Sequence, residues 1–151
     1  NAVDELQGTI STRSKVTKSV VDILIQWGHQ WAGKAEWQSF LNKSSLSHEL
    51  EECLFVIQIF MSWLEEEGND TSDIHNNTPL VIVDVCCGKG ILSMLLSYLL
   101  TDNQLRKRYG AQKIIMLDKA QMNWEHVKAA NETCELEDRP IIETWSGMNL
   151  H

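Results

Sequence analysis

The hydrophobic positions in the first half of the chain recur at helical spacing. Between residues 16 and 31, and again between 50 and 64, large apolar side chains return every three or four positions. This period gives an α-helix one apolar face. A short amphipathic segment, 35–41, lies between them. We therefore expect residues 1–78 to form an α-helical N-terminal region that ends in a polar linker at 68–78.

After Pro79 the pattern changes to short apolar runs separated by segments of helical length. Residues 80–85 form the first run, 113–118 the second and 141–145 the third. Helices are expected between them, at 91–100, which has almost no charge, and from about residue 120 to 131. Runs of this kind are typical of strands that are buried on both faces of a parallel sheet. The order strand–helix–strand–helix–strand predicts parallel pairing with right-handed crossovers. The expected fold class is α/β, preceded by the helical region.

Charge and composition narrow the possible functions. The formal net charge is −8, and residues 46–73 contain eight acids but no Lys or Arg. We interpret this run as a solvated helix face followed by a loop. No DNA-binding motif or basic stripe is evident, and no apolar run approaches the ~18 residues that a membrane span needs. We therefore expect no contact with a membrane.

The cysteines, tryptophans and histidines mostly predict structural roles. Four cysteines, two of them adjacent, fit neither a disulfide framework nor zinc-ligand spacing. We therefore expect no metal site and an intracellular location, cytoplasmic or nuclear. Cysteines at the start of a helix can also have a lowered pKa. The histidines are expected at exposed or helix-terminal positions. Five tryptophans are expected in the core: Trp27, Trp31, Trp37, Trp63 and Trp124.

A glycine-rich turn, D-V-C-C-G-K-G from Asp84 to Gly90, joins the first expected strand to the next helix. Its glycines allow positive φ and let a ligand approach the main chain. Asp118 ends the second strand, and the carboxyl ends of parallel strands meet at one edge. Its carboxylate is therefore expected beside the turn, where it can accept hydrogen bonds from both ribose hydroxyls of a nucleoside. Alternatively, the glycines only make a tight turn, and Asp118 caps the following helix.

Neither common phosphate-binding pattern fits the turn. The dinucleotide motif G-x-G-x-x-G matches in neither register, and the P-loop lacks its first glycine and its Ser or Thr. The runs V-D-V-C-C-G-K-G-I-L-S, I-I-M-L-D and M-N-W-E-H-V-K-A-A-N instead resemble the class I S-adenosylmethionine-dependent methyltransferases. The first run is similar to the eukaryotic form D-x-x-x-G-K-G-x-L-S. The resemblance covers about residues 79–150.

The resemblance implies a Rossmann-like fold, the cofactor S-adenosyl-L-methionine and a set of binding residues. Asp84 would hold the amino end of the methionine moiety, and Asp118 would bind the ribose. The other residues implied to contact the cofactor line the turn or lie beside the adenine: Cys86, Gly88, Gly90, Lys119, Met148 and Asn149. Cys86 stands where the family usually has glycine, and the commonly acidic position near the adenine is Met148 or Asn149.

Residues 79–151 would then form the cofactor-binding half of a methyltransferase domain, truncated after the third strand. The family's acceptor-facing residues usually follow the fourth strand, so no catalytic residue is predicted. The methyl acceptor would be RNA, a protein or a small molecule. The missing strands would come from the rest of the chain or from a partner, and this piece alone is expected to be inactive. The alternative is a non-catalytic interaction module that retains the fold.

Overall fold

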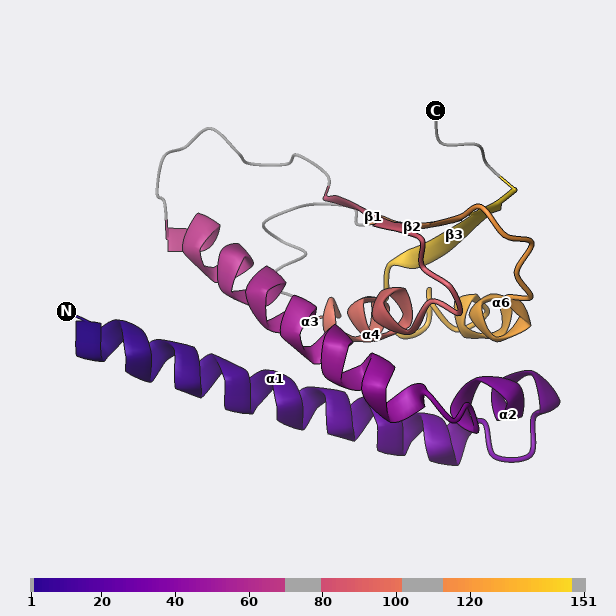
Figure 1. The fold of residues 1–151 in the computed structure, drawn as a ribbon, viewed down its shortest axis with the longest axis horizontal. Coiled ribbons are helices and arrows are strands. Elements are labelled where there is room, and N and C mark those ends of the chain that lie inside the picture. The colour runs from indigo at the N-terminus through magenta and orange to yellow at the C-terminus, as the bar shows by residue number, and fades with distance from the viewer. Residues whose placement is uncertain (1, 70–79, 102–112, 148–151) are drawn as a thin grey trace.

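The computed structural model describes residues 2–69, 80–101 and 113–147, and for residues 2–14 and 67–69 it describes the backbone alone. This part of the chain is an α/β protein with one three-stranded parallel sheet, an arrangement compatible with a Rossmann-like fold (Figure 1). Its elements are α1 (Ala2–Gln30), α2 (Ala35–Leu41), α3 (Leu46–Asn69), β1 (Val81–Val85), α4 (Ile91–Leu99), β2 (Lys113–Asp118), α6 (Glu125–Asn131) and β3 (Ile141–Ser146).

The sheet has the order β1-β2-β3, and both pairs of neighbours are parallel, as the sequence predicted. Val85 pairs with Leu117, and Leu117 pairs with Trp145, so the three strands end in register. The segments that follow the three strands therefore leave the sheet at the same edge. This register brings the turn after β1 next to the end of β2.

Helix α4 lies between the sheet and the N-terminal helices (Figure 1). It contacts β2 and β3 on one side and α1 and α3 on the other. Seven of its nine residues are buried, including Met94 and Leu95, and none of the nine is charged. A helix that is covered on both sides must be apolar almost all round. The uncharged sequence of this segment follows from that position.

An aromatic cluster joins the N-terminal helices to the sheet layer. The rings of Trp31 and Trp37 are stacked with centroids 3.4 Å apart. The large aromatic residues that are buried are Trp27, Trp31, Trp37, Phe40, Tyr98 and Trp124. Four of the five tryptophans expected in the core are therefore there. The prediction for Trp63 is wrong, because it lies on the outer face of α3 and is 43% exposed.

Only one face of the sheet is covered by the helices that the structure describes. Ile114 and Met116 point into the core and are fully buried. Val81, Val83 and Val85 point to the other face, and each is about half exposed. The prediction that these strands are buried on both faces is therefore wrong for the described residues. An apolar β-branched run indicates a strand, but it does not say whether a second layer covers it.

Two element boundaries differ from those expected. Helix α3 extends to Asn69, into the segment expected to be a linker, and the rest of that segment lies outside the described residues. Helix α6 begins at Glu125, whereas the sequence suggested a start near residue 120. The side-chain oxygen of Asn123 accepts the backbone N–H of Glu125 at 3.0 Å, which explains the late start. In the described part of the chain, we find no helix with both the length and the apolar character of a membrane span.

Candidate functional site

The turn between β1 and α4 is built from backbone conformations that favour glycine. The value of φ is positive at Cys86 (60°), Gly88 (55°) and Gly90 (80°). Cys86 and Cys87 both direct their N–H groups to the carbonyl oxygen of Leu117, at 2.8 and 3.3 Å. The N–H of Gly90 donates to the carbonyl of Cys87 at 2.8 Å and closes the turn. The main chain is therefore held in one shape before the helix starts.

The two glycines of the turn meet different surroundings. A Cβ atom at Gly90 would lie 2.2 Å from Cε of the buried Met116, so a side chain here would force the end of Met116 to shift within the core. A Cβ atom at Gly88 would meet no atom within 4 Å. The backbone of Gly88 therefore borders open space, while that of Gly90 is pressed against the core. Of the two, only Gly88 offers its main chain to a ligand.

Asp118 lies beside this turn, as the strand order led us to expect. One of its carboxylate oxygens, Oδ2, accepts the backbone N–H of Gly88 at 2.9 Å. The other, Oδ1, accepts the N–H of Ala120 at 2.8 Å. The carboxylate thus fixes both the turn after β1 and the bend after β2. The alternative interpretation, that Asp118 caps the following helix, is wrong: α6 begins at Glu125, and its N-cap residue is Trp124, whose side chain makes no capping hydrogen bond.

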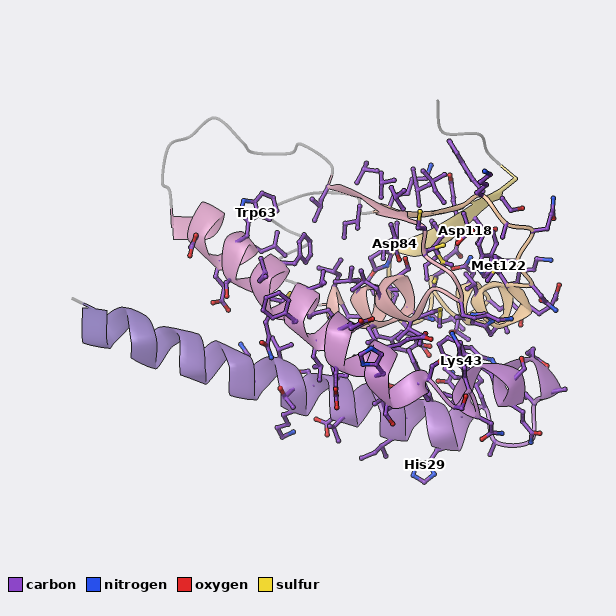
Figure 2. All side chains as sticks on the ribbon, in the orientation of Figure 1. His29, Lys43, Trp63, Asp84, Asp118 and Met122 are labelled. Atoms are coloured by element: carbon purple, nitrogen blue, oxygen red, sulfur yellow. The ribbon has the colours of Figure 1, made fainter. Side chains whose placement is uncertain are left out.

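Asp84 comes from the strand next to that of Asp118 (Figure 2). The hydroxyl of Ser93 in α4 donates to its Oδ2 at 2.7 Å. Burial raises the pKa of Asp84, and hydrogen bonds from the side chain and backbone of Ser93 partly offset that rise. Asp84 is only partly buried, so its carboxylate is both anchored to the first turns of α4 and accessible in part.

The thiol of Cys87 does not have the lowered pKa that a position before a helix suggests. Burial raises the pKa of Cys87 to about 12, and the nearby carboxylates of Asp84 and Asp118 act in the same direction. A neutral thiol is a poor nucleophile. Cys87 therefore offers no support for covalent catalysis at the turn, whereas the neighbouring Cys86 is exposed.

Two aromatic N–H groups hold the outer side of the turn, and sequence reasoning missed both. The indole N–H of Trp124 donates to the carbonyl oxygen of Gly88 at 2.9 Å. The Nε2 atom of His126 lies 2.7 Å from the carbonyl oxygen of Lys89. A carbonyl oxygen can only accept, so Nε2 carries the proton. These two bonds fix consecutive carbonyl groups of the turn. From the sequence we expected Trp124 in the core, but the pattern did not indicate that its indole N–H donates to Gly88.

His126 also links the turn to the N-terminal helices. It lies in the first turn of α6, yet only 2% of it is exposed, whereas we had expected an exposed or merely helix-terminal histidine. Its ring stacks on that of Phe40 in α2, with centroids 4.5 Å apart. Burial lowers its pKa. The turn and the helical region are therefore one packed unit, joined through this side chain.

The residues implied to lie beside an adenine are only partly described. Lys119 follows β2 and is exposed. Met148 and Asn149 lie outside the described residues. Just before them, the N–H of Gly147 donates to the carbonyl oxygen of Asp118 at 3.1 Å. The end of β3 thus lies next to Asp118, which is where an adenine segment would have to begin.

Among the described residues we find no second candidate for a functional site. They contain no group of three or more His, Cys, Asp and Glu placed to hold a metal ion. A shallow hollow of about 360 Å³ lies between α2 and α6, away from the glycine turn. Its lining residues are Glu36, Glu125, Lys128, Ala129 and Glu132. Lys128 is paired with Glu125 at 3.0 Å, so the hollow is a solvated acidic surface.

Comparisons of the chain with known protein families, with curated proteins and with solved structures give no significant match. The resemblance to methyltransferases therefore rests on the sequence motifs. The function has to be inferred from the contacts around the turn.

Proposed function

We propose that this chain binds S-adenosyl-L-methionine at the turn after β1, as the cofactor-binding part of a class I methyltransferase domain. The observation that supports this most directly is the contact between Asp118 and Gly88. It joins an acid at the end of one parallel strand to a glycine turn at the end of its neighbour. Nucleosides bind at such strand ends in open α/β sheets.

In this proposal Asp118 binds the ribose. A carboxylate has about four lone-pair sites for hydrogen bonds. Two of them accept the N–H groups of Gly88 and Ala120. The remaining sites can accept the two neighbouring hydroxyls of a ribose. The main-chain bonds orient the carboxylate in advance, which reduces the entropy lost when the sugar binds.

The methionine moiety would lie along the turn. Gly88 has no side chain and borders open space, so the cofactor can approach its main chain. The exposed Cys86 would line the same turn, whereas Gly90 is buried against Met116 and would not touch the cofactor. Asp84 would hold the ammonium group, directly or through water. A sulfonium and an ammonium are both cations, and two carboxylates from neighbouring strands favour them electrostatically. A pyrophosphate would be repelled by the same pair.

The proposed reaction is a displacement at the sulfonium methyl group. The protein's contribution to such a step is to hold the nucleophile in line with the methyl carbon and the sulfur. This chain's residues would bind and orient the cofactor. The acceptor, which we propose to be RNA, a protein or a small molecule, would be held by strands beyond this part of the sheet. Lys119, Met148 and Asn149 would flank the adenine.

A second function is favoured by one observation. Both oxygens of Asp118 already accept main-chain N–H groups, so the turn is internally satisfied without a ligand. A non-catalytic module that keeps this fold for protein interactions would need a turn that is stable without a bound ligand. The two functions differ in one measurable property, which is affinity for the cofactor.

Isothermal titration of the chain with S-adenosylhomocysteine separates these functions. We expect binding at micromolar ligand, and at least a tenfold loss of affinity for Asp118→Asn, whose NH2 group replaces one of the two oxygens that accept main-chain N–H groups. Circular dichroism checks that this variant is folded. Asp22→Asn is the matched control, because Asp22 lies on α1 in an exposed pair with Lys18. NAD⁺ serves as the dinucleotide control and should not bind. A folded chain that binds no S-adenosylhomocysteine at high micromolar concentration would support the interaction module instead.

A further inference from the structure

The face of α3 that points away from the core is apolar. Phe55, Val56, Ile59 and Trp63 are each between 43% and 66% exposed, and we call them the outer stripe of α3. They recur at helical spacing, so they form one continuous strip. Figure 2 shows Trp63 projecting from the side of α3 that faces away from α1. The core side of the same helix carries Ile57 and Leu64, so α3 is apolar on two faces.

Carboxylates bracket the outer stripe. Glu52 precedes Phe55 by three positions, and Glu66 follows Trp63 by three, so both acids lie on the same face as the stripe. Both are exposed. At 1.5 Å per residue the two acids are about 21 Å apart. No Lys or Arg occurs between residues 46 and 73. The strip is therefore a short apolar surface with negative charge at each end.

This charge pattern disfavours two of the possible occupants. A second copy of the chain would bring acids against acids, because antiparallel pairing sets Glu52 against Glu66 and parallel pairing sets each acid against itself. Like charges at an interface cost affinity. An anionic membrane surface would be repelled in the same way. A basic partner would gain from both the apolar contact and the charges.

We propose that the outer stripe of α3 binds a basic amphipathic helix of a partner protein. The complementary helix has an apolar strip of about two turns with Lys or Arg beyond both ends. Such helices bind through apolar anchors at positions i, i+3 or i+4, and i+7. Phe60 stacks on Trp63 with ring centroids 5.9 Å apart, which gives the strip a rigid aromatic end. This binding does not depend on the proposed cofactor function.

Two designed 18-residue helical peptides test the proposal by fluorescence anisotropy with the full chain. Both carry a strip of leucines; one has Lys at both ends of the strip and the other has Glu. We expect the Lys peptide to bind at least tenfold more tightly. Ile59→Glu should remove this binding. Ile25→Glu is the matched control, because Ile25 is an equally exposed apolar residue on α1.

Charge reversal supplies the decisive comparison. In the double variant Glu52→Lys and Glu66→Lys, the preference should invert toward the Glu peptide. Equal loss of binding in Ile25→Glu and Ile59→Glu would overturn the proposal, as would an unchanged preference after charge reversal. Sedimentation that shows a dimer, dispersed by Ile59→Glu, would assign the stripe to a second copy instead. Binding to phosphatidylserine vesicles that is lost in Ile59→Glu would assign it to a membrane surface. Circular dichroism confirms that each variant is folded.

Discussion

The carboxylate of Asp118 accepts the backbone N–H of Gly88 at 2.9 Å, although 30 positions separate the two residues. Together with the bonds from the two cysteine N–H groups of the turn to the Leu117 carbonyl, this bond connects the ends of two neighbouring parallel strands. The carbonyl of the same glycine accepts the indole N–H of Trp124. The N–H and the carbonyl of Gly88 are therefore both hydrogen-bonded, and its Cα is the part that remains open to a ligand. A ligand at this edge would meet a surface whose shape is set in advance.

Replacing each glycine of the turn by alanine should affect a different property: stability at Gly90 and ligand affinity at Gly88. Gly90→Ala places a Cβ against buried Met116 at positive φ, and overpacking with that strain should cost about 2–4 kcal/mol of the free energy of unfolding. Gly88→Ala meets no atom and should cost only about 1–2 kcal/mol for its positive φ. It should nevertheless weaken S-adenosylhomocysteine binding at least tenfold. Denaturant unfolding and calorimetric titration measure the two effects, and full affinity in Gly88→Ala would contradict the proposed approach of the ligand.

Cys86 holds a left-handed conformation that suits glycine better than any residue with a side chain. Its φ is 60°. Cys86→Gly removes a strain of about 1–2 kcal/mol but adds about 0.5–1 kcal/mol of backbone entropy to the unfolded chain. We therefore expect a net gain of about 0.5–1 kcal/mol in the free energy of unfolding. Cys86→Ala retains a Cβ and should change stability little. Urea unfolding of both variants tests this, and destabilisation by glycine would show that the cysteine side chain stabilises the turn.

Sequence periodicity predicted the helices and strands whose formation depends mainly on their own residues. The strands at 113–118 and 141–145, the short helix at 35–41 and the uncharged α4 all lie close to the expected positions. The location of Asp118 beside the turn was also predicted from the sequence, because the carboxyl ends of neighbouring parallel strands lie at the same edge of the sheet. Strand order alone therefore brought the two halves of the candidate site together.

What the sequence did not reveal depends on contacts between distant elements. His126 is buried because Phe40 of α2 covers it and Lys89 supplies an acceptor, and neither partner is near it in the chain. Trp63 lies at helical spacing from Ile59 and Phe55 on an apolar face of α3, yet 43% of it is exposed. Periodicity identifies an apolar face and cannot say whether another element covers that face.

His126 should make folding stability sensitive to acid. Burial lowers its pKa below the ordinary value of 6.5, so the unfolded chain takes up this proton at a higher pH than the folded chain does. Stability contributed by His126 is therefore present above pH 6.5 and is lost as the pH falls through 6.5 toward the lowered pKa. The loss is at most about 1.4 kcal/mol per pH unit.

The variant His126→Gln isolates this effect, because glutamine offers an N–H to Lys89 but does not titrate. The unfolding free energies of both proteins are measured between pH 7.5 and 5, and their difference is followed. We expect the parent protein to lose stability relative to the variant as the pH falls. Parallel curves over this range would mean that His126 is protonated equally in the folded and unfolded states.

Arg139 ties the segment after α6 to α4 and should be among the most costly residues to replace. Its guanidinium is buried and donates to the carbonyl of Ala130 at 2.7 Å, to the hydroxyl of Ser97 at 3.1 Å and to that of Thr133 at 2.9 Å. It also pairs with Glu137. Arg139→Met removes these donors from a buried site and breaks the pair with Glu137, which should cost about 3–5 kcal/mol of the free energy of unfolding.

The geometry of the guanidinium matters as much as its charge. Arg139→Lys keeps the charge, but its single nitrogen cannot reach all the acceptors that the guanidinium contacts with three separate nitrogen atoms, so we expect a loss of about 2 kcal/mol or more. Lys18→Met is the control ion-pair variant, since Lys18 and Asp22 are exposed, and it should change stability by less than about 0.5 kcal/mol. Chemical denaturation of the three variants measures their free energies of unfolding and so ranks the three losses. Equal stability of Arg139→Lys and the parent would show that charge alone holds α4 to this segment.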